Sequence, residues 1–306
     1  MATPHPARVR VVEVGPRDGL QHETATIATA DKITFVNRLS AAGLRAIEVS
    51  AFVSPRWVPA MADAADVFAG IARAQGVRYS ALVPNVRGLE RALAANVEEV
   101  GIFAAASETF SRKNINQDIA ESFSTYAAVC DAARTGGVRV RGYVSTAFGC
   151  PFEGAVPAPR VVESTRRLLE LGVYEVAVSD TIGVAHPGQV RGVLDALLKA
   201  IPCGSLALHF HDTRGTALAN VLASLEYGIA TFDAAAGGLG GCPYAPGATG
   251  NLATEDLIYM LDGLEIETGV QIERLLDASR FIEPLVGHPL PSRYVRAEAA
   301  TRRRGV

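Results

Sequence analysis

The chain has 306 residues, of which 49% are hydrophobic and 20% are charged, and its formal net charge is −3. This composition is that of a globular protein and excludes a disordered chain, while the near-neutral charge argues against a nucleic-acid-binding protein, which would need a strongly basic face. The longest uncharged run, residues 234–254, contains six glycines and two prolines, so it cannot be a membrane-spanning helix of about 20 apolar residues.

The cysteine usage indicates a reducing compartment. Cys130, Cys150, Cys203 and Cys242 are widely spaced and include no C-x-x-C pair, which favours free thiols over a disulfide framework. The first ten residues lack the apolar segment of a signal peptide. We therefore expect a cytoplasmic protein with no membrane partner.

Short apolar runs rich in β-branched residues alternate along the chain with longer stretches of helical periodicity. The predicted strands are Val9–Val14, Ala46–Ser50, Tyr79–Val83, Val100–Ala105, Val138–Val144, Glu175–Ser179, Leu206–Phe210 and Thr231–Ala235. The predicted helices are Asp31–Ala42, Asp63–Ala74, Arg87–Ala95, Ala120–Arg134, Pro159–Leu171, Pro187–Ala200, Ala217–Tyr227 and Thr254–Leu264. Eight such units predict an α/β fold, a (β/α)₈ TIM barrel.

We expect the barrel, a catalytic domain, to occupy residues 1–267, with a short helical or irregular C-terminal appendage at 268–306 that packs on the barrel or trails from it. Catalytic groups in such barrels lie at the carboxyl ends of the strands. The polar residues at those positions are Arg17, Asp18, Glu48, Ser145, Asp180, His209, His211 and, at the end of a long loop, Asn251. A site assembled from so many strands is typical of an enzyme.

The pentapeptide Leu208–Asp212 (L-H-F-H-D) closes the seventh predicted strand. Side chains alternate faces along a strand, so His209 and His211 point to the same side about 7 Å apart and can hold one metal ion. A pair of hydrogen-bonded core histidines is the alternative interpretation. After the first strand, Asp18 is a candidate oxygen ligand and Arg17 a candidate donor to a carboxylate or an oxyanion, unless the two form a surface salt bridge.

The segment Gly237–Asn251 is rich in glycine. Ordering so many glycines costs conformational entropy, so the segment is a candidate lid over a substrate or an anion cradle. Cys242 is a candidate acid or base within it, with an inert small side chain as the alternative, and Asn251 alternatively caps the next helix. Glu48 and Asp180 are candidate bases or partners of metal ligands, or else members of ordinary ion pairs.

Taken together, several motifs resemble the 3-hydroxy-3-methylglutaryl-CoA lyases, from about Val11 to about Gly269. They are V-E-V-G-P-R-D-G-L-Q, S-A-F-V-S-P-R-W-V-P, A-A-S-E-T-F-S-R-K-N-I-N, G-Y-V-S-T-A-F-G-C-P, H-F-H-D-T and G-G-L-G-G-C-P-Y-A-P-G-A-T-G-N-L-A-T-E-D. The first motif also marks a wider superfamily of metal-dependent lyases and aldol-type synthases. The cysteine-containing glycine loop and the F-V-S-P-R-W-V-P stretch are more specific to the lyases.

The resemblance implies a role for each candidate residue. It implies a divalent cation, Mg²⁺ or Mn²⁺, with the ligands Asp18, His209, His211 and Asn251. It implies the catalytic residues Cys242, Arg17, Glu48 and Asp180, and the substrate-binding residues Arg17, Gln21, Ser145 and Thr181. It also implies an acyl-CoA substrate and a homo-oligomer of two or more chains.

The reaction implied is the cleavage of 3-hydroxy-3-methylglutaryl-CoA to acetyl-CoA and acetoacetate, in the breakdown of leucine or related branched acids. One departure stands out: the chain has Ala51 where such lyases carry a serine. It leaves open a lyase for a longer 3-alkylglutaryl-CoA or for citramalyl-CoA. A condensing enzyme similar to isopropylmalate synthase is disfavoured because such synthases carry an added C-terminal region, and only 37 residues follow Gly269 here. A non-catalytic ligand-binding relative is disfavoured because the metal-ligand set, Arg17 and Cys242 are all present.

Overall fold

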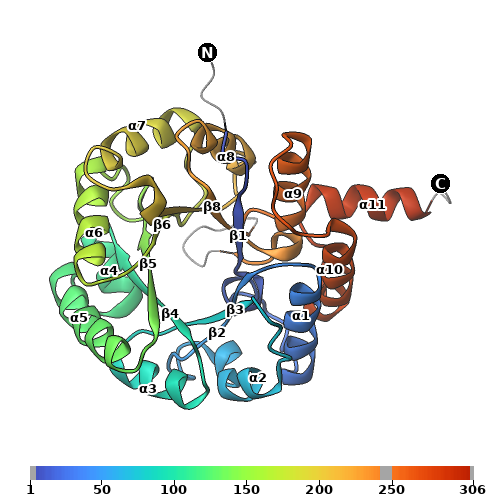
Figure 1. Ribbon diagram of the computed structural model, residues 1–306, viewed down its shortest axis with the longest axis horizontal. Coiled ribbons are helices and arrows are strands. Elements are labelled where there is room, and N and C mark those ends of the chain that lie inside the picture. The colour runs from blue at the N-terminus through green and yellow to red at the C-terminus, as the bar shows by residue number, and fades with distance from the viewer. Residues whose placement is uncertain (1–4, 242–249, 304–306) are drawn as a thin grey trace.

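The computed structural model describes residues 5–241 and 250–303, in which parallel strands close into a barrel in sequence order (Figure 1). The strands are β1 (Arg10–Glu13), β2 (Ala46–Ala51), β3 (Arg78–Leu82), β4 (Glu99–Ala105), β5 (Arg139–Ser145), β6 (Val176–Asp180), β7 (Leu206–Phe210) and β8 (Thr231–Ala234). The barrel closes where β1 pairs with β8 through Val12 and Asp233. The predicted TIM barrel is confirmed.

Helices surround the barrel on its outside (Figure 1). They are α1 (Thr29–Ala41), α2 (Ala64–Gly70), α3 (Val86–Ala94), α4 (Glu108–Ile115), α5 (Ile119–Thr135), α6 (Ala158–Glu170), α7 (Pro187–Leu197), α8 (Ala217–Leu225), α9 (Thr254–Gly263), α10 (Ile272–Val286) and α11 (Arg293–Arg303). Each predicted strand boundary lies within one residue of the observed one. Helix boundaries are less accurate.

Two helix predictions are wrong in detail. The helix predicted to reach Ala74 ends at Gly70, because Ile71 adopts an extended backbone. A Cβ atom on Gly70 would lie 2.3 Å from Ile33 Cδ1, so α2 ends where it packs closely on α1. The short helix α4 was not predicted; Ser107 caps it by accepting a hydrogen bond from Phe110 N, but its polar sequence has no apolar periodicity.

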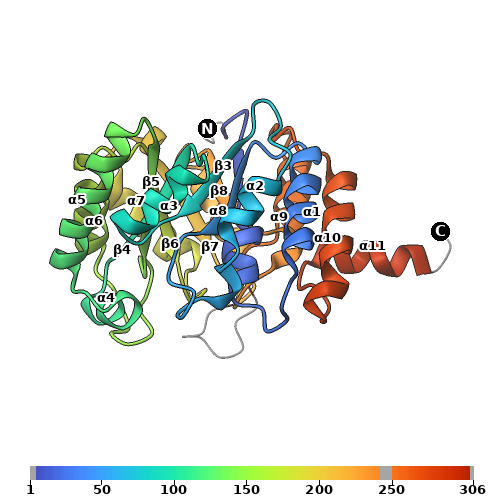
Figure 2. The same cartoon turned by 90° about the horizontal axis from the view of Figure 1, so that it is seen from below.

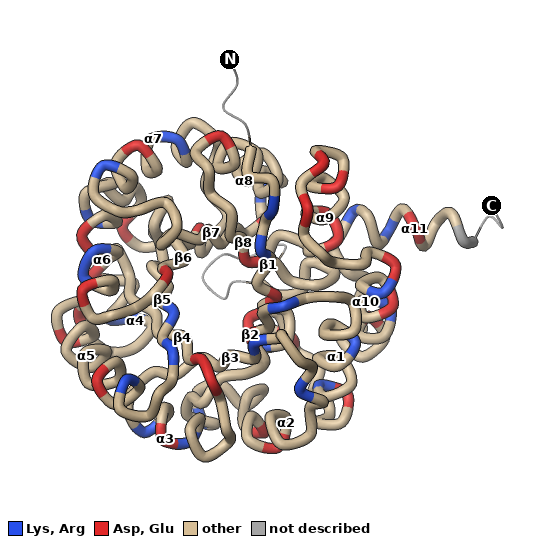
Figure 3. The backbone as a smooth tube through the Cα atoms, viewed as in Figure 1, with Lys and Arg blue, Asp and Glu red and all other residues tan. Residues whose placement is uncertain are grey.

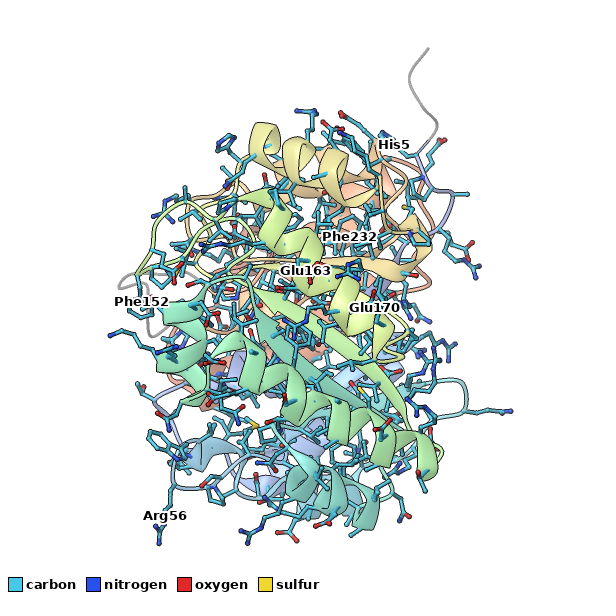
Figure 4. The ribbon with its side chains drawn as sticks, turned by 90° about the vertical axis from the view of Figure 1, so that its left-hand side faces the viewer. His5, Arg56, Phe152, Glu163, Glu170 and Phe232 are labelled. Carbon is cyan, nitrogen blue, oxygen red and sulfur yellow. The ribbon has the colours of Figure 1, made fainter. Side chains whose placement is uncertain are left out.

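The helices turn apolar faces to the barrel and polar faces to solvent. On α6, Val161 and Leu168 are fully buried, whereas Glu163 and Glu170 lie on the outer face and Phe232 lies inside (Figure 4). Charged residues occur on the strands as well as on the helices (Figure 3). These inward charges must be paired, because an isolated buried charge is costly.

The C-terminal segment divides into two parts. Helix α10 lies beside α1 (Figures 1 and 2) and buries Leu275, Ala278 and Ile282 in the main hydrophobic cluster. Helix α11 projects away from the barrel (Figure 2). The domain boundary at residue 267 stays a prediction. Within the described ranges, no helix combines the length and the apolar character needed to cross a membrane.

Candidate active site

The loops after the strands mark the face of the barrel on which a site is expected. Arg56 follows β2 and Phe152 follows β5, and both lie on one side of the molecule, whereas His5, before β1, lies on the other (Figure 4). The carboxyl face is therefore the side of Arg56 and Phe152.

At this face, the turn η1 (Gly15–Gly19) follows β1 and carries Arg17 and Asp18. The Asp18 amide donates to the carbonyl of Val14 at 2.7 Å, which turns the chain back over the end of the strand. A Cβ atom at Gly19 would lie 2.8 Å from Leu239 Cβ, so glycine allows the turn to approach the start of the glycine-rich segment. The turn is thereby held against the chain that follows β8.

Asp18 faces His209 of β7 and His211, which directly follows that strand. One ligand atom each from Asp18, His209 and His211 lie within 4.8 Å of one another, and the two imidazole ring centroids are 5.1 Å apart. The backbone pairs Asn251 with His211, and Asn251 Nδ2 donates to Asp18 Oδ2 at 2.9 Å. The structure thus brings together all four residues predicted as cation ligands.

The donor set fits a cation. In the described ranges, His211 Nδ1 and Asn251 Oδ1 are buried and have no hydrogen-bond partner, which is costly for a polar atom unless a ligand satisfies it. The alternative interpretation, a pair of hydrogen-bonded core histidines, fits His209, which bonds to Asp233, but not His211, whose buried Nδ1 has no partner within the described residues. Imidazole, carboxylate and amide oxygen ligands together suit a divalent metal.

The local electrostatics favour the metal-binding protonation states of Asp18 and His211, whereas Asp233 and Asp18 raise the pKa of His209 against the effect of its burial. Burial alone would raise the pKa of Asp18, but Arg17 and the two histidines bring it well below its usual range. Burial, together with the charge of His209, lowers the pKa of His211 to about 3. A carboxylate and a neutral imidazole are the forms that coordinate metals.

Arg17 and Glu48 form a buried ion pair rather than a surface one. Arg17 Nε donates to Glu48 Oε2, Arg17 Nη1 donates to Asp18 Oδ1 at 2.5 Å, and the Tyr143 hydroxyl donates to Glu48 Oε1 at 3.0 Å. Glu48 is therefore the ion-pair partner anticipated as its alternative role. It holds the guanidinium of Arg17 beside the histidine–aspartate triad.

Asp180, at the end of β6, forms no ion pair with any residue that the structure describes. It accepts hydrogen bonds from the amides of Val184 at 2.9 Å and Ala185 at 3.0 Å. Burial raises its pKa to about 6, although these amides and the charge of His209 oppose the rise. A carboxylate with a pKa near neutrality is suited to exchange a proton.

Besides Arg17, the three other residues predicted to bind substrate lie around this face. Gln21 Nε2 is 3.2 Å from His22 Nε2, and the Thr181 hydroxyl accepts a hydrogen bond from the Thr146 amide at 2.8 Å. Ser145 is half-buried at the end of β5. Their substrate contacts stay predictions, and Cys242 lies outside the described residues.

Sequence reasoning missed four charged residues and one tyrosine that support the site. They are Glu13, Arg141, Tyr143, Asp233 and Glu255, all buried. Three of the charged residues stand inside predicted apolar strands, where a charge points into the barrel and needs a partner. That position is the signal that could have identified them.

Two of these carboxylates hold the base of the glycine-rich segment. Glu13 Oε1 accepts from the amides of Gly15 at 2.9 Å and Ala236 at 2.8 Å. Glu255 Oε2 accepts from Gly237 N at 2.8 Å. The backbone that follows β1 and the backbone that follows β8 are thus both hydrogen-bonded to buried carboxylates.

A cavity of about 410 Å³ opens beside Asn251, between the loop after β7 and the start of α11. Arg214, Arg293 and Arg296 contribute to its lining. These guanidinium groups suit an anionic ligand, and Asp212 and Asp256 also line the cavity.

A family model described as HMGL-like matches residues 8–282. The chain belongs to the HMGL-like family. Among the relatives of this HMGL-like chain, hydroxymethylglutaryl-CoA lyase YngG of Bacillus subtilis is 53% identical over 290 residues, which are 95% of this chain and 97% of the relative. A Pseudomonas aeruginosa relative named 3-hydroxy-3-isohexenylglutaryl-CoA/hydroxy-methylglutaryl-CoA lyase is 53% identical over 292 residues, 95% of this chain and 97% of that protein.

Solved structures of this HMGL-like family agree with the barrel. The hydroxymethylglutaryl-CoA lyase from Pseudomonas aeruginosa has a TM-score of 0.96 at 52% identity and covers 98% of this chain and 100% of its own. An HMG-CoA lyase from Acinetobacter baumannii, in complex with coenzyme A and 3-methylmalate, has a TM-score of 0.91 at 41% identity over 95% of each chain. The resemblance found in the sequence motifs is confirmed.

The raised pKa of the buried Glu255 carboxyl leads us to expect that the stability of this HMGL-like chain depends on pH. Burial raises its pKa from 4.5 to about 8, so between these values the folded state holds a proton that the unfolded state releases. The free energy of unfolding should therefore fall as pH rises, by about 1.4 kcal/mol per pH unit from this group. Glu255→Gln, which mimics the protonated acid, removes this contribution.

Urea unfolding at pH 5.5, 6.5 and 7.5 measures the slope. The matched control is Glu163→Gln on the outer face of α6, which should keep the wild-type slope. Equal slopes for wild type and Glu255→Gln would contradict the raised pKa.

Proposed function

We propose that the protein is a divalent-cation-dependent carbon–carbon lyase that cleaves 3-hydroxy-3-methylglutaryl-CoA to acetyl-CoA and acetoacetate, in leucine breakdown. The observation that carries the proposal is the joint presence of the Asp18–His209–His211 triad and the buried Arg17–Glu48 pair at one barrel mouth. Relatives named as lyases for this thioester, 53% identical over nearly the whole chain, support it. A cytoplasmic location and a homo-oligomeric assembly stay predictions.

The four proposed ligands are Asp18, His209, His211 and Asn251, and Mg²⁺ or Mn²⁺ matches their mixed oxygen and nitrogen donors. Such a cation, when bound, supplies Lewis-acid polarisation of a substrate oxygen. The arginine-lined cavity beside Asn251 supports an anionic substrate such as a CoA thioester.

The chain's own residues account for the proton and charge movements. Asp180, with its pKa near 6, takes the proton of the tertiary hydroxyl. The hydroxyl oxygen becomes the ketone of acetoacetate as the adjacent C–C bond breaks, and its electron pair moves into the thioester as an enolate. Arg17 faces this enolate oxygen with Nη2, since Nε and Nη1 are held by Glu48 and Asp18.

Cys242, in the glycine-rich segment, is the proposed acid that gives a proton to the enolate carbon and so yields acetyl-CoA. Cys242→Ala should lower kcat by about 10²-fold or more, the usual contribution of a positioned acid, with little change in KM. The measurement is acetoacetate release at saturating substrate, with Cys203→Ala, a thiol near the end of α8, as the control. Near-full turnover of the Cys242 variant would exclude this role.

Removal of the cation tests the reaction and the metal site together. Protein stripped with a chelator should release no acetoacetate from 3-hydroxy-3-methylglutaryl-CoA, and added Mg²⁺ or Mn²⁺ should restore release. His211→Ala should weaken activation by the cation about 100-fold or more, because a direct ligand is lost. Full turnover in the presence of chelator would contradict the proposal, and cation binding without turnover would indicate a different thioester.

A longer 3-alkylglutaryl-CoA is the second candidate substrate. Ala51 is fully buried at the end of β2. The neighbouring Ser50 hydroxyl donates a hydrogen bond to Met61 Sδ at 3.3 Å, so this hydroxyl does not take the place of a serine hydroxyl at position 51. The Pseudomonas relative whose name includes the isohexenyl substrate is 53% identical.

The substrate range can be tested at this position. Wild type should cleave both 3-hydroxy-3-methylglutaryl-CoA and its isohexenyl analogue, and Ala51→Ser should lower kcat/KM for the isohexenyl analogue about tenfold more than for the methyl substrate. The measurement is CoA-thioester cleavage with each substrate. An unchanged ratio would show that residue 51 does not set the size of the acyl group.

A further inference from the structure

A continuous series of buried side chains crosses the barrel interior and joins the two sides of the active site. In order of contact, it consists of His209, Asp233, Arg141, Tyr143, Glu48, Arg17 and Asp18. The residues at its two ends, His209 and Asp18, belong to the same triad. We call this series the buried ring.

The link between His209 and Asp233 follows from strand register. β7 and β8 pair with His209 directly beside Asp233, and His209 Nδ1 lies 3.3 Å from Asp233 Oδ2. The side chain of Asp233 is 0% exposed. An ionised carboxylate can only accept, so His209 donates from Nδ1, and its neutral form with the proton there has Nε2 free to bind an ion.

Arg141 keeps Asp233 ionised and oriented. From β5 its Nη2 and Nη1 atoms reach Asp233 Oδ1 at 2.7 Å and Oδ2 at 3.2 Å, a two-pronged contact that fixes the carboxylate plane. Arg141 Nε also donates to Glu175 Oε1 at 2.8 Å. Held at both ends, the guanidinium has little freedom to let Asp233 rotate.

We propose that Asp233 and Arg141 are positioning residues for the cation site: together they fix the tautomer and ring orientation of His209, so that Nε2 faces the ion. The inference rests on the proposed cation site and adds residues that touch neither ion nor substrate. Through Tyr143, which accepts from Arg141 Nη1 at 2.9 Å and donates to Glu48, the same guanidinium also braces the side of the site that carries Arg17.

Asp233→Asn tests the positioning role. An amide oxygen in the Oδ1 position loses the bond to His209, and one in the Oδ2 position loses the bond from Arg141 Nη2 and sets the amide NH₂ group against that guanidinium, so the two-pronged contact that orients the side chain is lost either way. Calorimetric titration of chelator-stripped protein with Mn²⁺ alone should show affinity 10- to 100-fold weaker than wild type, the range for a lost partner of a metal-bound histidine. Saturating Mn²⁺ should restore much of kcat.

The matched control is Glu99→Gln. Glu99 is also a buried barrel carboxylate, 3% exposed, and its partners are Tyr174 OH at 3.0 Å and Arg78 Nε at 3.4 Å, neither of which belongs to the buried ring. This variant should lose thermal stability as Asp233→Asn does, yet bind Mn²⁺ like wild type. Equal weakening of Mn²⁺ binding in both variants would reduce Asp233 to a structural role.

Two further variants separate the remaining outcomes. In a His209→Ala background, Asp233→Asn should cause no additional loss of Mn²⁺ affinity, because its effect passes through His209. If Asp233→Asn does not fold, Arg141→Lys, which keeps the charge and loses the two-pronged contact, should weaken Mn²⁺ binding severalfold. Wild type that binds no Mn²⁺ would overturn the cation site, whereas Asp233→Asn that binds as well as wild type would overturn only the positioning role.

Discussion

The structure depends on the pairing of charges inside a closed barrel. Closing the strands turns Glu48, Arg141 and Asp233 toward an interior from which water is largely excluded, and an unpaired charge there would be too costly for a marginally stable fold. Each is satisfied by a partner from another strand, as Arg17 is by Glu48. The pairs that neutralise the interior also set the orientation of the groups at its mouth.

The site therefore has two kinds of component with different demands. Within the described residues, His211 Nδ1 and Asn251 Oδ1 are buried polar atoms without a hydrogen-bond partner, which is the condition for binding a ligand. The side chains behind them are fully hydrogen-bonded, as Asp233 is by Arg141 and His209. The unpaired polar atoms at the mouth of the barrel are tolerated because the hydrogen-bonded side chains behind them hold the site rigidly.

Much of the fold and of the candidate site could be predicted from local sequence. Alternating apolar runs and helical stretches specify the barrel, and the i, i+2 spacing of His209 and His211 puts both rings on one face of β7. The place of Asp233 inside an apolar strand marks it as an inward charge, but its pairing with His209 and that of Tyr143 with Glu48 could not be found in this way, because these contacts join β7 to β8 and β2 to β5 and depend on how the barrel closes. Helix α4 was missed since its cap residue Ser107 precedes a segment with no apolar stripe.

The carboxylate of Glu13 also constrains the order of events in folding. It bonds the amide of Ala236, 223 residues further along the chain, and shares the Gly15 amide at the start of the Arg17–Asp18 turn. The contacts between β1 and β8 that close the barrel thus also shape the active site. A nascent chain that has not yet reached β8 can form neither the completed Arg17–Asp18 turn nor the complete Asp18–His209–His211 triad. Contacts between residues so far apart in sequence are slow to form, so the turn that carries Arg17 and Asp18 reaches its final hydrogen bonding only once β8 has joined the barrel.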